Sequence, residues 1–205
     1  MAKQPSDHAP VLSVPRLAVD AGHRLDGARR LDSPHSDARP DPADISLLVV
    51  HAISLPPDEV GTARNRGYID DLFLGRLDPA AHPYFETIRG LRVSAHVCIF
   101  RDGAITQYVP FDCRAWHAGV SSYNGREHCN DYSIGVELEG SDTLPFTDAQ
   151  YASLAAMTGA LLRRYPALTP RRIAGHSDVA PGRKTDPGPH FDWARFRHSL
   201  EGSPA

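Results

Sequence analysis

Apolar and polar residues follow one another along the chain in ways that predict several strands. Residues 46–51, "SLLVVH", form an apolar and β-branched run without alternation, which is typical of a strand buried on both faces. Across residues 93–100, "VSAHVCIF", apolar and polar positions alternate with the two-residue period of a strand. The "RDG" at 101–103 predicts a hairpin turn, after which residues 104–109 return as a second strand.

A further alternating segment carries two carboxylates. In residues 133–140, "SIGVELEG", one face is apolar and the other holds Glu137 and Glu139. We therefore expect both carboxylates to point away from the apolar side. Residues 171–176, "RRIAGH", predict one more strand, which ends at His176.

The helical period is plainest in residues 147–165. Thr147 and Gln150 form a capping box, apolar residues then recur at helical spacing, and Pro166 forbids continuation of the helix. Asp192 is a candidate N-cap for a terminal helix. Shorter helices are expected in residues 68–77, 82–91 and 192–201.

These elements predict one α+β (mixed α/β) domain with a central mixed β-sheet flanked by helices, because strands and helices mix without strict βαβ repetition. The domain is expected to span residues 16–200. Residues 1–15 are rich in Pro, Ser, Asp and His without periodicity, as in a disordered N-terminal tail.

Composition narrows the function classes. The 205 residues are 41% hydrophobic and 23% charged, as in a compact globular protein, and the net charge of -3 with scattered arginines excludes nucleic acid as a partner. Three cysteines without a CxxC pair indicate a reducing compartment rather than a disulfide framework. Neither a membrane-spanning run nor the apolar core of a signal peptide is visible, so we expect a cytoplasmic protein.

Candidate chemistry gathers at the ends of predicted strands. His51 and His176 each end a strand, and Asp186 follows ten residues after His176 in a loop that prolines stiffen. Two imidazoles and a carboxylate match the three protein ligands of a catalytic zinc site. Spacing alone leaves Asp178 open as the oxygen ligand. It also leaves three further histidines as candidates: His96, His117 and His190.

Two more residues would complete a hydrolytic site. Attack on an amide needs a proton acceptor and a cation near the developing oxyanion. Glu137, on the polar side of its strand, is the candidate acceptor, and Lys184 in the stiff loop is the candidate cation. Taken alone, each is as readily an exposed surface charge.

Several segments in order resemble a known family. They are "SPHSDARPD", "SLLVVHAISLPP", "YIDDLF", "LDPAAHPYFETIRGLRVSAH", "RDGAITQYVPFDCRAWHAGVSSYNGREHCNDYSIGVELEG" and "GHSDVAPGRKTDPGPHFDWARFR". Together they resemble the AmpD-type N-acetylmuramoyl-L-alanine amidases, bacterial cytoplasmic enzymes of cell-wall recycling. The resemblance runs from about residue 16 to about residue 198 and implies the zinc amidase fold shared with peptidoglycan recognition proteins.

The resemblance also implies the site and the reaction. Zn²⁺ would be held by His51, His176 and Asp186, with Glu137 and Lys184 as catalytic residues. The reaction would be hydrolysis of the amide between the lactyl group and L-alanine in 1,6-anhydromuropeptides, small-molecule substrates, by a monomer without a membrane partner. Substrate contacts are expected at Tyr68, Arg92, Trp116, His117 and His128.

Some residues depart from the family pattern. Ala52 stands where relatives commonly have Asn, and His128 where they commonly have Arg, so a carboxylate contact there is expected to be weaker. Residues 60–67, "VGTARNRG", are interpreted as an insertion that forms a flap over the groove.

The rival functions are a muropeptide-binding module without catalysis and an amidase that lyses intact wall. A cysteine amidase that uses Cys129 and His128 would need special geometry, because adjacent residues on an extended chain point in opposite directions.

Overall fold

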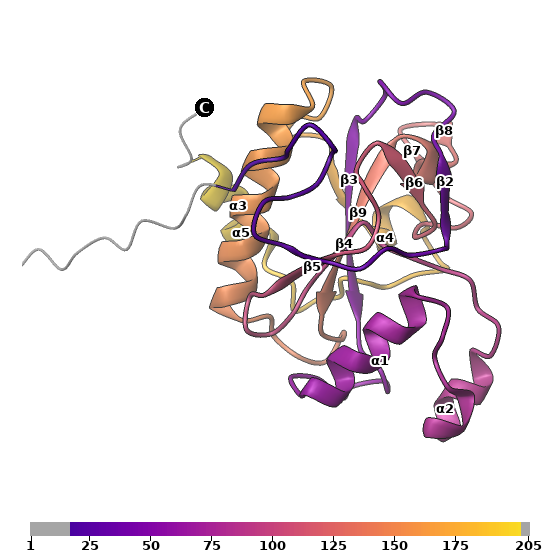
Figure 1. The fold of residues 1–205 in the computed structure, drawn as a ribbon. Coiled ribbons are helices and arrows are strands. Elements are labelled where there is room, and N and C mark those ends of the chain that lie inside the picture. Colours follow the sequence, from indigo (N-terminus) through magenta and orange to yellow (C-terminus); the bar gives the residue numbers. More distant parts are fainter. Residues whose placement is uncertain (1–16, 202–205) are drawn as a thin grey trace, which may run out of the picture.

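A six-stranded mixed sheet forms the centre of the protein in a computed structural model, which describes residues 17–201 (Figure 1). Only the β4–β5 pair is antiparallel; the other four pairs are parallel. This confirms the expected mixed sheet. In sheet order the strands are β1 (Arg29–Arg30), β5 (Ile105–Gln107), β4 (Val97–Ile99), β9 (Ser133–Glu139), β3 (Leu47–Ile53) and β10 (Ile173–Gly175).

Helices cover the sheet on both sides (Figure 1). The long α3 (Asp148–Arg164) packs with α5 (Trp193–Glu201) on one face. On the other face, α1 (Ala63–Phe73) and α2 (Pro83–Thr87) share a buried apolar cluster with Cys98 of β4. The remaining elements are short: β2 (Ser36–Ala38) paired with β6 (Cys113–Ala115), β7 (Ser122–Tyr123) paired with β8 (Arg126–Glu127), α4 (His176–Val179), and two 3-10 turns, η1 (Pro79–Ala81) and η2 (Cys129–Asp131).

Strand β9 is buried on both faces. Its apolar side packs in the same cluster as α3, as alternation predicts. Glu137 and Glu139 lie on the opposite side, but they are only 9% and 1% exposed. The Glu139 carboxylate accepts hydrogen bonds from the backbone N–H groups of Gly61 and Arg101, so it ties two loops to the strand. These carboxylates are therefore buried groups rather than surface charges.

The expected strands occur with shifted ends. Strand β3 is buried on both faces as predicted, but it continues past His51 to Ile53. His176 is the first residue of α4 rather than the end of β10. The hairpin turn is confirmed by a hydrogen bond from the backbone N–H of Phe100 to the carbonyl of Ala104. Its two strands, β4 and β5, are shorter than the alternation suggested.

The predicted long helix is confirmed at both ends. Thr147 Oγ1 accepts from the Gln150 backbone N–H at 3.1 Å, and Gln150 Oε1 accepts from the Thr147 N–H at 3.1 Å. The helix ends at Arg164, with Tyr165 as C-cap directly before Pro166. Asp192 likewise caps α5 as predicted, since its Oδ1 accepts from the Arg195 N–H at 2.9 Å.

Replacement of Thr147 by alanine should lower the free energy of unfolding by about 1 kcal/mol, because the helix loses its side-chain N-cap. Urea denaturation of T147A and T147S measures the effect. The serine variant retains the hydroxyl and should stay within about 0.5 kcal/mol of the parent. Equal losses in both variants would show that the cap does not stabilise α3.

The shorter helices differ from their predicted bounds. Helix α1 begins five residues before residue 68, because Thr62 and Asn65 form a capping box that starts it at Ala63. Residues 63–67 of the expected flap therefore form the first turns of α1. Helix α2 covers only five residues of 82–91. No helix within residues 17–201 is long and apolar enough to cross a membrane, and the expected N-terminal tail lies outside the described residues.

Candidate metal centre

Two neighbouring parallel strands bring the two candidate histidine ligands together. Strands β3 and β10 pair with Val50 opposite Gly175. The next residues along the two strands are His51 and His176, so both histidines lie at the same edge of the sheet. On the other side of β3, His51 pairs directly with Glu137 of β9. Side chains of paired residues in a parallel sheet project from the same face. The sheet register thus places His51, His176 and Glu137 at one site.

Asp186 reaches the same site from the loop after α4. The Ser177 backbone N–H donates to the Asp186 carbonyl at 2.9 Å, which holds this loop against the start of the helix. Asp178, the other candidate oxygen ligand, is used differently. Its carboxylate accepts from the Gly175 N–H at 2.7 Å and caps α4. Of the described residues, the set that can jointly hold a metal ion is His51, His176 and Asp186.

The three donor atoms are spaced as ligands of one ion. His51 Nδ1 lies 2.9 Å from His176 Nδ1, and Asp186 Oδ2 lies 3.3 Å and 3.0 Å from these two nitrogens. A tetrahedral ion with bonds of about 2.0–2.1 Å separates its ligand atoms by about 3.3 Å. Small adjustments would therefore let the three atoms share one ion.

The surroundings keep His51 and Asp186 in the protonation states that metal binding requires. Burial holds the pKa of His51 at about 4, so its imidazole is neutral at neutral pH. Burial alone would raise the pKa of Asp186, but hydrogen bonds with His176 and His51 outweigh it and lower the pKa below its usual range. Metal binding requires neutral imidazole and ionised carboxylate. His51 and Asp186 have these states before any ion binds.

A cleft of about 550 Å³ opens over the three ligands. Glu137 lines it, and among residues 17–201 its Oε2 has no hydrogen-bond partner although the atom is buried. Burial, with the negative charge of Asp186, raises the pKa of Glu137 well above its usual range, while Lys184 partly offsets this. Lys184 is exposed and lines the same cleft. Both candidate catalytic residues therefore face the ligand cluster.

The five candidate substrate residues do not all reach this cleft. His117 lines it, whereas His128 lines an adjoining hollow that shares Arg183 with the cleft. Tyr68 packs on Phe85, with ring centroids 4.8 Å apart. The other two contact each other, since the Arg92 guanidinium lies 5.4 Å from the centroid of Trp116.

The other candidate histidines lie outside the ligand set. The ring of His96 is buried, and its Nδ1 accepts from the backbone N–H of Gly135 at 2.9 Å. His190 is exposed and lies outside the metal set. Sequence reasoning missed Asn130, which accepts hydrogen bonds from the backbone of His117 and Ala118. It also missed the apolar wall of the cleft, which is formed by Tyr84, Ile88 and Leu91. Neither feature has a signal in the sequence beyond its own residue types.

Comparison with known proteins assigns this site to a family. The N-acetylmuramoyl-L-alanine amidase profile matches residues 41–189, which include all the residues of the cluster. The chain belongs to this family. The 1,6-anhydro-N-acetylmuramyl-L-alanine amidase AmpD of Citrobacter freundii is 66% identical over 181 residues, or 88% of this chain and 94% of the relative.

Solved structures of amidases agree with this assignment. The crystal structure of a selenomethionine AmpD derivative superimposes with a TM-score of 0.83 at 63% identity, covering 87% of this chain and 97% of that one. AmpDh3 of Pseudomonas aeruginosa, in complex with anhydromuramic pentapeptide, is 27% identical with a TM-score of 0.55, over 76% of this chain and 60% of that one. The protein is thus an amidase, a hydrolase with the fold predicted for it.

Proposed function

We propose that this amidase is a zinc enzyme that hydrolyses the lactyl-L-alanine amide of 1,6-anhydromuropeptides in peptidoglycan recycling. The observation that carries the proposal is the convergence of three ligand atoms beside the buried Glu137 in one cleft. The substrate is inferred from the names of relatives that share more than half of their residues with this chain. A cytoplasmic monomer is the expected form.

The donor set favours zinc. Two imidazole nitrogens and one carboxylate oxygen, with a position left open to the cleft, are typical of catalytic zinc. When bound, such an ion supplies Lewis acidity and lowers the pKa of a water molecule toward about 7. Carboxylate-rich oxygen sites, which suit calcium or magnesium, need more oxygen ligands than this cluster offers.

The protein's own residues carry the proton and stabilise charge. Among the described residues, none bonds the buried Oε2 of Glu137, which lines the cleft, so in its ionised form Glu137 can take a proton from water and pass it to the leaving amine. Lys184 lines the same cleft, and its ammonium would stabilise the oxyanion that develops on the amide carbonyl.

The proposal predicts that the purified protein contains about one zinc per chain and releases L-alanine-headed peptides from soluble anhydromuropeptides. Atomic absorption measures the metal, and liquid chromatography measures the peptides. Removal of zinc with a chelator should abolish turnover, and added zinc should restore it.

The rival functions give different results in the same assay. A binding module would retain anhydromuropeptide without releasing peptide. A lytic amidase would cleave intact wall faster than soluble anhydromuropeptides. Turnover that survives complete removal of metal would contradict the proposal.

A further inference from the structure

The dipeptide His117–Ala118 contacts both imidazoles of the metal cluster, one through a side chain and the other through the backbone. His117 Nδ1 lies 2.9 Å from His51 Nε2, and the Ala118 carbonyl lies 3.3 Å from His176 Nε2. These are the ring nitrogens that point away from the cluster. Partners of this kind fix the orientation and the tautomer of ligating histidines.

Only one arrangement of protons leaves both ligating nitrogens free. The Ala118 carbonyl can only accept, so His176 carries its proton on Nε2 and presents a bare Nδ1 to the cluster. For His51 Nδ1 to be bare as well, His51 Nε2–H must donate to His117 Nδ1. The proton of the neutral His117 then lies on Nε2, where it donates to Ser133 Oγ at 3.1 Å.

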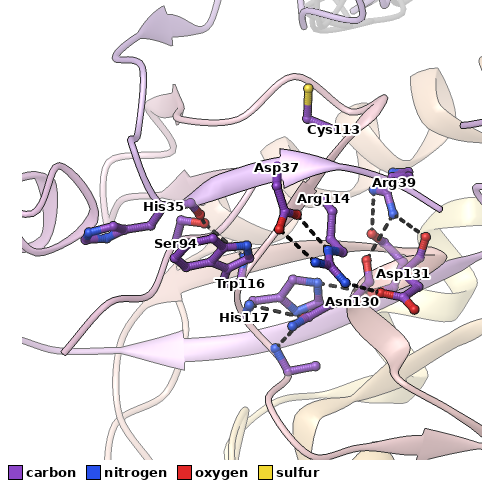
Figure 2. Close-up of polar contacts among 12 residues, drawn as sticks. His35, Asp37, Arg39, Ser94, Cys113, Arg114, Trp116, His117, Asn130 and Asp131 are labelled. Carbon is purple, nitrogen blue, oxygen red and sulfur yellow. Dashed lines mark hydrogen bonds and ion pairs between the residues drawn. The ribbon is translucent and has the colours of Figure 1, made fainter.

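The side chain of Asn130 holds this dipeptide in place. Its Oδ1 accepts from the backbone N–H of His117 at 3.2 Å and from that of Ala118 at 2.8 Å, and Figure 2 shows Asn130 beside His117. Both donors are backbone groups, so the acceptor must be the amide oxygen. One side chain thus fixes the segment that supports both histidines.

Asn130 is itself anchored by a buried cation. Arg39 is 4% exposed, and it donates to the carbonyls of Asn130 and Asp131 at 3.1 Å and to that of Ser133 at 2.7 Å. Figure 2 shows Arg39 and Asp131 close to Asn130. The guanidinium therefore positions both Asn130 and Ser133, two of the residues that form hydrogen bonds with His117.

The ring of His117 also has no room to move toward the sheet. A Cβ atom at Gly135 would lie 2.4 Å from the His117 ring, so only glycine allows the ring this close to β9. His51 and His96 contact the ring edge-on, with centroids 4.9 Å and 5.8 Å away. The ring is therefore confined by its neighbours as well as by its hydrogen bonds.

We propose that Asn130 and His117 are positioning residues, which orient His51 and His176 toward the ion through the His117–Ala118 segment. The inference rests on the proposed zinc function. It changes the expected role of His117 from a substrate contact to a support for a metal ligand. Neither residue has to touch the substrate for its loss to weaken the site.

Zinc affinity, measured by competition with a chromophoric chelator, tests the inference. Asn130→Ala and His117→Ala should each lower the affinity by about 10- to 100-fold, the usual effect of losing an outer partner of a ligand. Asn130→Asp keeps an acceptor for both N–H groups, and His117→Asn keeps one near Nδ1. Both conservative variants should recover most of the affinity. Asn124→Gly, at an exposed hairpin tip with positive φ, is the control and should bind zinc as the parent does.

Nitrogen NMR of the zinc-loaded parent supplies a second readout that does not depend on any variant folding. His51 and His117 should both carry their protons on Nε2. A proton on Nδ1 of His117, or alanine variants that fold and bind zinc like the parent, would overturn the inference and leave the proposed function standing. A parent protein that binds no zinc would overturn both.

Discussion

Asp186→Ala should yield a folded protein that neither retains zinc nor hydrolyses anhydromuropeptide. The substitution removes the one carboxylate of the cluster and leaves two imidazoles, which are too few for a stable site. Loss of a residue that only hydrogen-bonds to a metal ligand lowers affinity by up to about 100-fold. Loss of a ligand itself should lower the zinc affinity by more than that. Metal analysis after dialysis and the peptide-release assay measure the two losses.

Two further variants make the result specific. Asp186→Asn preserves the shape of the side chain, so circular dichroism of this variant separates loss of the ligand from loss of the fold. Asp178→Asn is the matched control, because an amide oxygen can still accept from the Gly175 N–H that Asp178 caps. It should keep zinc and activity. If Asp186→Ala keeps full activity, or Asp178→Asn loses zinc, the ligand assignment is wrong.

Glu137→Gln should lower kcat by about 10²- to 10⁴-fold while zinc content stays at the parent level. Glutamine has nearly the same shape but cannot take a proton from water and return it to the leaving amine. KM should change little, since the substitution removes a proton-transfer group rather than a binding contact. Steady-state kinetics on anhydromuropeptide, with metal analysis of the same sample, gives all three quantities.

Glu139→Gln is the matched control for this change. Glu139 lies two residues further along the same strand and the same face, but its carboxylate accepts from two loop N–H groups instead of facing the ligands. We expect lower stability with kcat within a few-fold of the parent. Loss of zinc from Glu137→Gln would instead identify Glu137 as part of the metal site.

Helix ends that are set by residues close by in the sequence were predicted correctly. The capping box at Thr147 and the stop at Pro166 define α3, and Asp192 defines the start of α5. Helix α1 was misplaced because its box pairs Thr62 with Asn65, whereas the usual partner is Glu or Gln. A polar segment with glycines then looked like a loop, although its cap makes it helical.

Burial and assembly depend on tertiary structure and were harder to predict. Alternation correctly separated Glu137 from the apolar face of β9, but it could not show that earlier segments of the chain, such as the loops of Gly61 and Arg101, also cover the other face. The residue types and the family resemblance identified His51, His176 and Asp186 as candidates, and the pairing of β3 with β10 explains why the two histidines meet. The support from Asn130 arises between segments distant in sequence, and no spacing rule reveals it.

The metal cluster joins parts of the chain that lie far apart in sequence, since 125 residues separate His51 from His176. An ion bound there would act as a reversible cross-link that closes this long loop, and closing a long loop restricts an unfolded chain strongly. An unfolded chain cannot present the three ligands together, so the ion binds the native state in preference. Availability of zinc in the cell would then govern how long each molecule resists unfolding and proteolysis, in addition to whether it is active.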